Sequence, residues 1–200
     1  MESKFTVLTP DDYVTTQWSG GSTTQLMIAP PGAVYADRDF LWRVSSATVE
    51  LEESDFTPLP DYRRFISTIR GDMTLSHDGG DVFTLHPGDI HEFDGGAATR
   101  SVGRCTDFNL MLRKGEADGS MSSLDLVPGH TVFRVEDGAK TVLIYCADGI
   151  VDVSSGDSRR RLNAGKTLLV QGAVDELLDL ACLEPAKLMI AQTWRVERMT

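Results

Sequence analysis

The sequence predicts an all-β fold made of two jelly-roll barrels in tandem, and three observations support this prediction. Stretches with a helical period are almost absent. Short runs of β-branched and aromatic residues alternate instead with Gly, Pro, Asp and Asn, a pattern typical of sandwiches and barrels. A plan of leucine, turn, glycine and strand in residues 80–89 returns in residues 161–168, which favours a duplicated jelly roll.

The runs that predict strands cover most of the chain. In the first half they span residues 5–8, 14–18, 23–29, 41–52, 65–70, 73–76, 82–85, 91–93 and 105–112. In the second half they span residues 131–136, 140–146, 150–154, 167–170, 177–183 and 188–196. Residues 174–180 also fit a single helical turn, and the sequence leaves both possibilities open for them.

One segment divides the chain into two parts of barrel size. Residues 114–123 combine glycine, serine and charged residues without an apolar period, which indicates a linker. Residues 1–115 then form an N-terminal barrel that carries the expected pocket, and residues 124–200 form a C-terminal barrel. We expect the C-terminal barrel to be completed by exchange with the N-terminal half.

Composition and charge exclude several classes of function. The net charge of −11 repels a phosphate backbone, so no nucleic-acid partner is expected. The N-terminus lacks the pattern of a signal peptide and no apolar run is long enough to span a bilayer, so no membrane partner is expected. Cys105, Cys146 and Cys182 are odd in number and far apart, which predicts buried, reduced thiols in a cytoplasmic protein.

The predicted strand at residues 41–52 is the most informative because its faces differ. Alternation puts Arg43, Ser45, Ala47 and Val49 on one face, which is polar at one end and apolar at the other. A barrel interior that is packed at one end and open to a ligand at the other produces such a gradient. A different reading is that Arg43 extends into solvent.

A second predicted strand carries a regular polar row, with Asp107, Asn109, Met111 and Arg113 on one face. Such a row is either a solvated outer face or the lining of a wet cavity. An Arg beside an Asp or Asn suits the recognition of a carboxylate or amide, because the guanidinium fork matches a carboxylate. Trp18 precedes two glycines in a turn, where its ring covers a pocket or fills a core.

Several segments, taken in order across residues 15–115, resemble the HutD/Ves family of the cupin superfamily. The matching segments are Trp18-Ser19-Gly20-Gly21-Ser22-Thr23, Trp42-Arg43-Val44-Ser45-Ser46-Ala47, Phe56-Thr57, Arg64 seven residues before Gly71, Phe93-Asp94-Gly95, and Asp107-Phe108-Asn109-Leu110-Met111 with Arg113. The second half of the chain shows only a general strand pattern. Two departures, Leu59-Pro60-Asp61 in place of an aromatic-proline-glycine and Gly96 in place of an Asp, concern the ligand more than the fold.

The resemblance implies a bicupin, two fused cupin-like jelly-roll barrels, without a metal or another cofactor. The segment Pro87-Gly88-Asp89-Ile90-His91 approximates the second metal motif of cupins, which supplies one histidine. The region of the first motif, residues 56–65, contains no histidine, and Arg64 stands where the motif has a Glu. A single histidine does not hold a transition metal, so no metal site is expected.

The resemblance also implies a link to histidine utilisation or stress response, in a family without a securely assigned reaction. We therefore expect a binding or regulatory protein without turnover, whose ligand is a small polar or acidic metabolite such as formylated or formimino-glutamate. No catalytic residue is assigned, and a homodimer is compatible with the sequence. The expected ligand-binding residues are Trp18, Arg43, Ser45, Arg64, His91, Phe93, Asp107, Asn109 and Arg113.

Two further functions stay open. The first is a metal-free isomerase or hydrolase that uses His91 as general base and an Arg as electrostatic stabiliser, which requires His91, Arg43 and Arg64 to face one cavity. The second is a protein-interaction module with a vestigial pocket, which predicts an exposed apolar patch around Trp42 and Val44.

Overall fold

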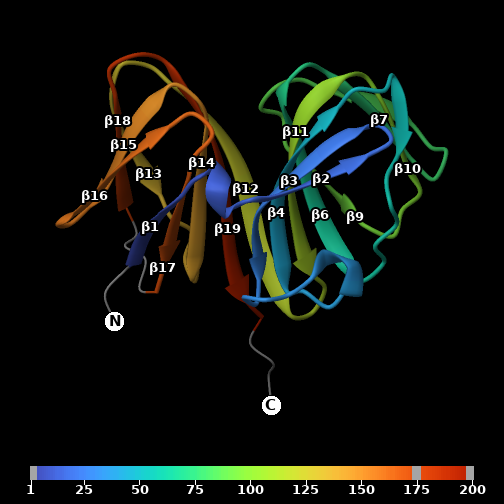
Figure 1. Cartoon of the computed structure of the whole chain (residues 1–200), viewed down its shortest axis with the longest axis horizontal. Coiled ribbons are helices and arrows are strands. Elements are labelled where there is room, and N and C mark those ends of the chain that lie inside the picture. The colour runs from blue at the N-terminus through green and yellow to red at the C-terminus, as the bar shows by residue number, and fades with distance from the viewer. Residues whose placement is uncertain (1–3, 173–176, 197–200) are drawn as a thin grey trace. The chain divides into compact units, whose positions relative to one another are not determined.

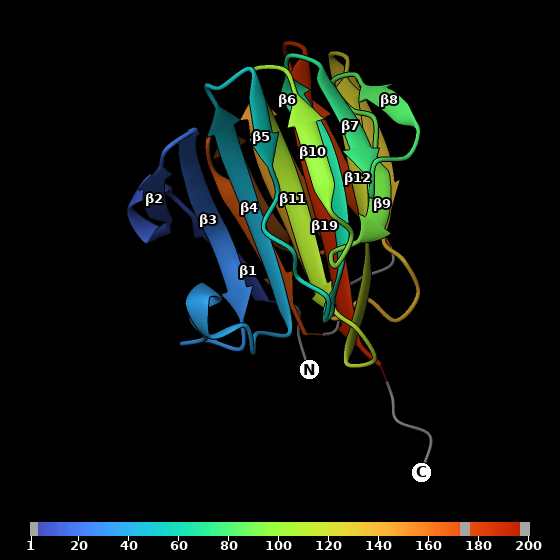
Figure 2. The same cartoon turned by 90° about the vertical axis from the view of Figure 1, so that its right-hand side faces the viewer.

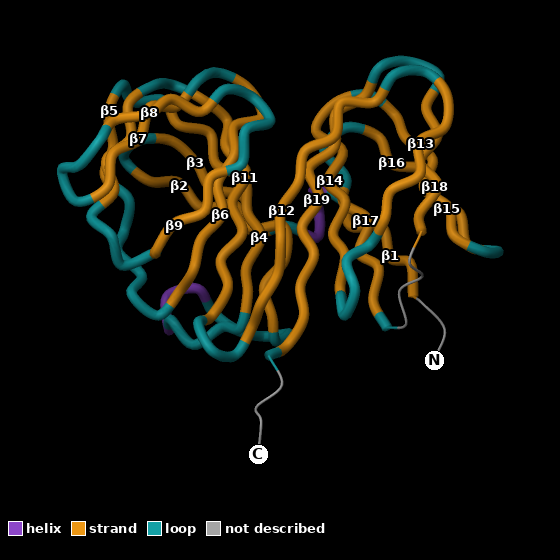
Figure 3. Tube along the Cα trace, turned by 180° about the vertical axis from the view of Figure 1, so that it is seen from behind, coloured by secondary structure: helices purple, strands orange, loops and turns teal. Residues whose placement is uncertain are grey.

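The computed structural model describes residues 4–172 and 177–196, and nearly all of its regular structure is β (Figure 1). The chain forms two compact units. The N-terminal unit comprises residues 13–118, and the C-terminal unit comprises residues 4–12 together with the described residues from 119 onward. Both helical segments, Pro10–Asp12 and Tyr35–Asp37, are 3-10 turns (Figure 3), and no helix in the described ranges is long and apolar enough to cross a membrane.

The N-terminal unit consists of two antiparallel sheets that face each other (Figure 2). The six-stranded sheet has the order β2 (Val14–Trp18), β3 (Gly21–Ala29), β4 (Trp42–Val49), β11 (Cys105–Arg113), β6 (Tyr62–Arg70) and β9 (His91–Asp94). The four-stranded sheet has the order β5 (Glu53–Asp55), β10 (Thr99–Val102), β7 (Met73–His77) and β8 (Val82–Leu85). Ile66 and Phe93 of the first sheet share a buried cluster with Met73, Leu75 and Leu85 of the second.

The C-terminal unit repeats this plan of two sheets. One sheet has the order β1 (Lys4–Leu8), β17 (Thr167–Gln171), β14 (Thr141–Asp148), β19 (Ala186–Arg195) and β12 (Ala117–Leu126). The other has the order β13 (Gly129–Arg134), β18 (Leu177–Cys182), β15 (Ile150–Ser155) and β16 (Ser158–Asn163). The first strand of the chain, β1, pairs antiparallel with β17, where Phe5 lies opposite Val170.

The all-β class predicted from the sequence is confirmed, but the predicted linker is wrong. Residues 117–126 form β12, and the two compact units divide within it, between Asp118 and Gly119. The strand was missed because its buried positions start with Ala117 and Gly119, so that alternation is present while the apolar side chains that reveal it are not. Strands β5, β10 and β16 were missed as well, since they are short or strongly polar.

The helical turn considered for residues 174–180 is also wrong where it can be compared. Residues 177–180 belong to strand β18, and residues 174–176 lie outside the described residues. The prediction that the cysteines are buried is confirmed, and all three are free thiols. Burial raises the pKa of the Cys105 thiol to about 12 and that of the Cys146 thiol to about 11, so neither forms a reactive thiolate near neutral pH.

Candidate functional site: an arginine-lined cavity

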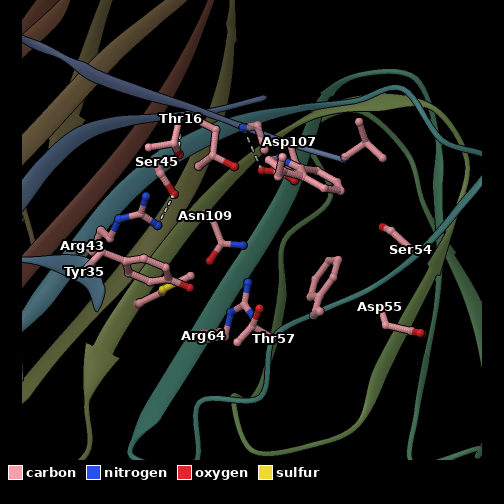
Figure 4. Close-up of a pocket in the computed structure, with 16 residues that line it drawn as sticks. Thr16, Tyr35, Arg43, Ser45, Ser54, Asp55, Thr57, Arg64, Asp107 and Asn109 are labelled. Carbon is pink, nitrogen blue, oxygen red and sulfur yellow. Dashed lines mark hydrogen bonds between the residues drawn. The ribbon is translucent and has the colours of Figure 1, made fainter. Parts of the chain in front are cut away.

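The N-terminal unit contains a cavity of about 300 Å³ on the inner face of its six-stranded sheet (Figure 4). The floor comes from strands β4, β6 and β11, and its residues are Arg43, Ser45, Ala47, Val49, Arg64, Asp107, Asn109 and Met111. The exposed lining residues are Thr16, Trp18, Asp55 and Thr57. The cavity therefore opens between β2 and the segment at β5, and its volume is at the lower end of the range for small-molecule sites.

Strand register explains why polar groups gather on this floor. In the β4–β11 pair, Ser45 lies opposite Asn109 and Ala47 lies opposite Asp107. Side chains of a strand alternate between its faces, so the two rows found in the sequence point to the same side of the sheet. The predicted inward orientation of Arg43 and Ser45 is confirmed, since both are buried and line the cavity.

Arg64 is a buried cation without a hydrogen-bond partner. The residue is 6% exposed, and its guanidinium carbon lies 4.9 Å from the ring centre of Phe56 and 5.1 Å from that of Phe93. No hydrogen bond or ion pair joins this guanidinium to any described residue, and its Nε is buried without an acceptor. Burial lowers the pKa of Arg64 to about 10, so the group stays charged at neutral pH.

Arg43 is also buried, but its guanidinium is held by neighbours. Its Nε donates to Gln25 Oε1 at 2.8 Å, and its Nη1 donates to Ser45 Oγ at 3.2 Å. The ring of Tyr35 lies between two guanidiniums, with its centre 4.2 Å from the Arg43 carbon and 3.9 Å from that of Arg38. These contacts fix the Arg43 fork at the cavity wall and leave its remaining N–H groups for a ligand.

Asp107 and Asn109 complete the floor. Asp107 is 6% exposed, and its Oδ1 accepts a hydrogen bond of 3.2 Å from the backbone N–H of Ala47. Burial raises the pKa of Asp107 to about 7, although Arg64 and Arg43 act in the opposite direction. Asn109 is 5% exposed and its Oδ1 is buried without a donor. The floor thus holds two buried polar atoms without a hydrogen-bond partner, Arg64 Nε and Asn109 Oδ1, and a ligand bound in the cavity is one explanation for them.

A family model described as HutD matches residues 10–190 of the chain, which covers most of both units. The chain belongs to the HutD family. This result confirms the resemblance found in the sequence and extends it into the second half, where the sequence pattern is weak.

Solved structures agree with the family. A conserved protein of unknown function, PA5104 from Pseudomonas aeruginosa PAO1, is 25% identical over 96% of this chain and 99% of its own, with a TM-score of 0.82. HutD from Pseudomonas fluorescens SBW25 is 23% identical over 97% of this chain and 100% of its own, with a TM-score of 0.78. A cupin 2 conserved barrel domain protein from Leptotrichia buccalis, 8% identical over 94% of this chain and 95% of its own, has a TM-score of 0.57. The predicted bicupin fold is confirmed, and no curated protein sequence matches the chain.

In this HutD-family chain, six of the nine expected ligand-binding residues line one cavity: Trp18, Arg43, Ser45, Arg64, Asp107 and Asn109. Three expected residues do not line it. Phe93 lies against Arg64 and supports it. Arg113 turns to another loop, where its Nη1 donates to the Arg38 carbonyl at 3.1 Å and its Nε donates to Glu116 at 3.2 Å. That any of the nine residues binds a ligand stays a prediction.

His91, the third of these residues, belongs to a different cluster. Its Nε2 lies 2.8 Å from Nε2 of His77, and the two rings are within 16° of parallel, the geometry of an N–H···N hydrogen bond. His77 Nδ1 lies 2.8 Å from Thr99 Oγ1, and both rings contact Phe83 and Phe93. A base acting on a ligand beside Arg43 and Arg64 has to face their cavity, and His91 does not meet that requirement.

A metal site requires several ligand side chains close together, and a protein-interaction module requires an exposed apolar patch. Among the described residues, no three His, Cys, Asp or Glu side chains are grouped so that they could hold a metal ion. Trp42 and Val44, expected at the centre of an exposed apolar patch, are 8% and 0% exposed. The patch that a protein-interaction module needs is therefore not formed by these two residues.

The sequence did not reveal several lining residues, above all Tyr35, Phe56 and the rim threonines. Tyr35 lies in a 3-10 turn, and Phe56 follows the short strand β5, so neither position has an alternation that shows where its side chain points. Trp18, in contrast, was expected at the site, and the glycine that follows it in the turn explains its position. A Cβ placed on Gly20 would lie 2.0 Å from the Trp18 ring, so the glycine lets that ring lie across the turn at the rim.

Proposed function

We propose that this HutD-family protein binds a small acidic metabolite in the N-terminal cavity and acts as a binding or regulatory protein in histidine utilisation, without turnover. The unpartnered guanidinium of Arg64 is the observation that carries the proposal. Removing an ionised side chain from water without a partner costs several kcal/mol. A ligand carboxylate in the cavity would form the missing charge-assisted hydrogen bonds, and it would fit the guanidinium fork with two of them.

The wider electrostatics of the cavity support an anionic ligand. On the buried floor, the two guanidiniums of Arg43 and Arg64 stand against one carboxylate, Asp107, whereas the second lining carboxylate, Asp55, lies on the exposed rim. This local excess of positive charge stands in a chain whose net charge is −11. A cationic floor in an acidic protein concentrates anions where the field is focused.

The absence of turnover in this proposal rests on how the polar groups are used. Ser45 Oγ accepts a hydrogen bond from Arg43, and a serine nucleophile needs an adjacent base rather than a cation. The histidine nearest to such a role, His91, is hydrogen-bonded to His77. The family name and the HutD structure from Pseudomonas fluorescens point to histidine utilisation, in which formylated and formimino-glutamate are acidic intermediates of the required size.

Thermal unfolding with added acids tests the proposal. The probes are N-formylglutamate, N-formiminoglutamate and formate, the last because the Pseudomonas fluorescens HutD structure is of a formate condition. A binding acid at a hundredfold excess over its Kd stabilises the folded state by about 2.7 kcal/mol and raises the Tm. We expect Arg64→Met to abolish the rise and Arg64→Lys to retain part of it, because lysine keeps the charge but loses the fork.

Arg104→Met is the matched control, since Arg104 is exposed and pairs with Glu52 outside the cavity. It should respond to the acids as the wild type does. A wild type that shows no Tm response to any of the acids, or an Arg64→Met variant that responds as strongly as the wild type, would contradict the proposed function.

A further inference from the structure

The charges on the cavity floor are not mixed but separated along the strands. Arg43 reaches back along β4, so that its Nη1 lies at Ser45, and Ser45 is opposite Asn109. Asp107 is the next inward-facing residue of β11 after Asn109, and two residues of a strand span about 7 Å. Figure 4 shows Asn109 between Asp107 on one side and Arg64 on the other. One end of the floor is therefore cationic and the other is acidic.

The carboxylate at the acidic end lies in the field of Arg64 and Arg43 but pairs with neither. No ion pair joins Asp107 to Arg43 or Arg64 in the described part of the chain, and the hydrogen bond to its Oδ1 comes from the neutral backbone N–H of Ala47. Midway along the floor, Asn109 Oδ1 is a buried acceptor that also lacks a donor. Asn109 Oδ1 requires an N–H group as donor, and the Asp107 carboxylate has lone pairs left to accept one, whereas the Nε–H of Arg64 requires an acceptor.

We propose that the cavity selects an amphoteric ligand, an acid whose far end carries an amine, amidine or similar nitrogen cation. The carboxylate would lie at Arg43 and Arg64, and the cationic nitrogen would lie at Asp107, with an N–H directed to Asn109. The inference rests on the proposed function, because the carboxylate end is the anion site already argued. It adds that the opposite end discriminates among acids by charge.

The state of Asp107 makes this selection dependent on pH. Burial raises the pKa of its carboxyl to about 7, so the group is ionised at pH 8 and largely protonated at pH 6. The neighbouring charged groups are Arg64 and Arg43, and both favour the ionised form. A ligand cation adds a further favourable charge, so it should bind more weakly as the pH falls from 8 to 6. An acid with a second carboxylate should show the opposite trend.

Three five-carbon acids that differ only at the far end test the inference by calorimetry at pH 8. They are 5-aminovalerate, valerate and glutarate, which end in an ammonium, a methyl and a second carboxylate. We expect the wild type to bind 5-aminovalerate about tenfold or more tightly than valerate, with glutarate the weakest. In Asp107→Asn this advantage should disappear and glutarate should gain affinity, while the amide oxygen can still accept the Ala47 hydrogen bond.

Two further variants assign the effect. Asp125→Asn, at an exposed carboxylate in the C-terminal unit, controls for net charge and should leave all three affinities unchanged. If Asp55→Asn, at the exposed carboxylate on the rim, removes the preference instead, the assignment to Asp107 is overturned.

The outcomes also separate this inference from the proposed function. Valerate that binds the wild type but not Arg64→Met supports the anion site whatever happens at the far end. Equal affinities for 5-aminovalerate and valerate would then overturn the inference alone. If none of the three acids binds, both proposals fail together. A Tm of Asp107→Asn at or above that of the wild type excludes misfolding as the cause of a changed preference.

Discussion

The two units share a plan of two facing antiparallel sheets, but they fill the space between the sheets differently. In the C-terminal unit the inward residues form one apolar cluster that includes Val142, Ile144 and Leu168 of one sheet and Val153 and Leu180 of the other. In the N-terminal unit the central strands place Arg43, Arg64, Asp107 and Asn109 at the corresponding depth, all of them 6% exposed or less. The fold therefore does not dictate function. The choice of inward side chains makes one unit a packed core and the other a site.

The difference has an energetic consequence. Apolar burial in the C-terminal unit stabilises the chain by roughly 25 cal/mol per Å² removed from water. The charged floor of the N-terminal unit acts against folding, since each buried ion without a partner is destabilising. We infer that the apolar core of the C-terminal unit stabilises the chain, and that the buried charges of the N-terminal unit lower the stability of the chain in favour of binding.

The largest effect is expected from creating a cavity in the apolar core. Leu168→Ala removes a side chain that is fully buried in that cluster, and the free energy of unfolding should fall by about 2–5 kcal/mol in chemical denaturation. Leu183→Ala is the control, because Leu183 is 89% exposed and its truncation should change the value by less than about 0.5 kcal/mol. Equal effects of the two substitutions would show that this unit is not packed as described.

The opposite sign is expected on the charged floor. Arg64→Met removes a buried cation that has no hydrogen-bond acceptor at its Nε. Its lost contacts with the rings of Phe56 and Phe93 are worth about 0.5–2 kcal/mol, less than the several kcal/mol of desolvation that is relieved, so the free energy of unfolding of the ligand-free protein should rise by about 1 kcal/mol or more. Measured together with Leu168→Ala, this variant tests the contrast between the units directly. A loss of stability comparable to that of a core truncation would mean that Arg64 stabilises the fold. It would contradict the contrast between a stabilising C-terminal core and a destabilising N-terminal floor.

Sequence reasoning succeeded where a strand alternates strictly and failed where it does not. The inward row of β4 could be found because Arg43 and Ser45 alternate with buried apolar residues such as Val44. The same logic placed Asp107 and Asn109 together, but only the register of β4 with β11 shows that Asn109 faces Ser45. Register depends on pairing between distant segments, which a single sequence does not display.

The expected residues that do not line the cavity show a second limit. Arg113 continues the alternation of β11 but lies at the end of the strand, where a loop offers it the Arg38 carbonyl and the Glu116 carboxylate. His91 continues the inward face of β9, yet it finds His77 on the other sheet. Alternation gives the face of a side chain, while its partner is decided by contacts across the barrel.

Asp107 provides a prediction of intermediate size. Its folded-state pKa of about 7 lies above the usual value of 3.8, so the folded state binds the proton more readily than the unfolded state. This carboxyl therefore stabilises the protein as the pH falls from 7 towards 4, by up to about 1.4 kcal/mol per pH unit. The gain in unfolding free energy of Asp107→Asn over the wild type should be larger at pH 8 than at pH 5. A gain that is the same at both values would show that Asp107 does not titrate near 7.

The smallest effect concerns a carboxylate of the C-terminal unit whose pKa moves in the opposite direction. Hydrogen bonds from Arg161 and Arg159 lower the pKa of Asp152, so its contribution to stability is present above pH 3.8 and is lost on acidification below that value. Both arginines are exposed, and pairs of this kind contribute about 0.2–1 kcal/mol. Asp152→Asn should lower the free energy of unfolding by that amount at pH 7 and by less in high salt, because salt screens exposed charges. A loss that does not change with salt would assign the effect to packing. The present contrast between the two carboxylates is that Asp152 pairs with two arginines at the surface, whereas Asp107 is buried and forms no ion pair with a described residue.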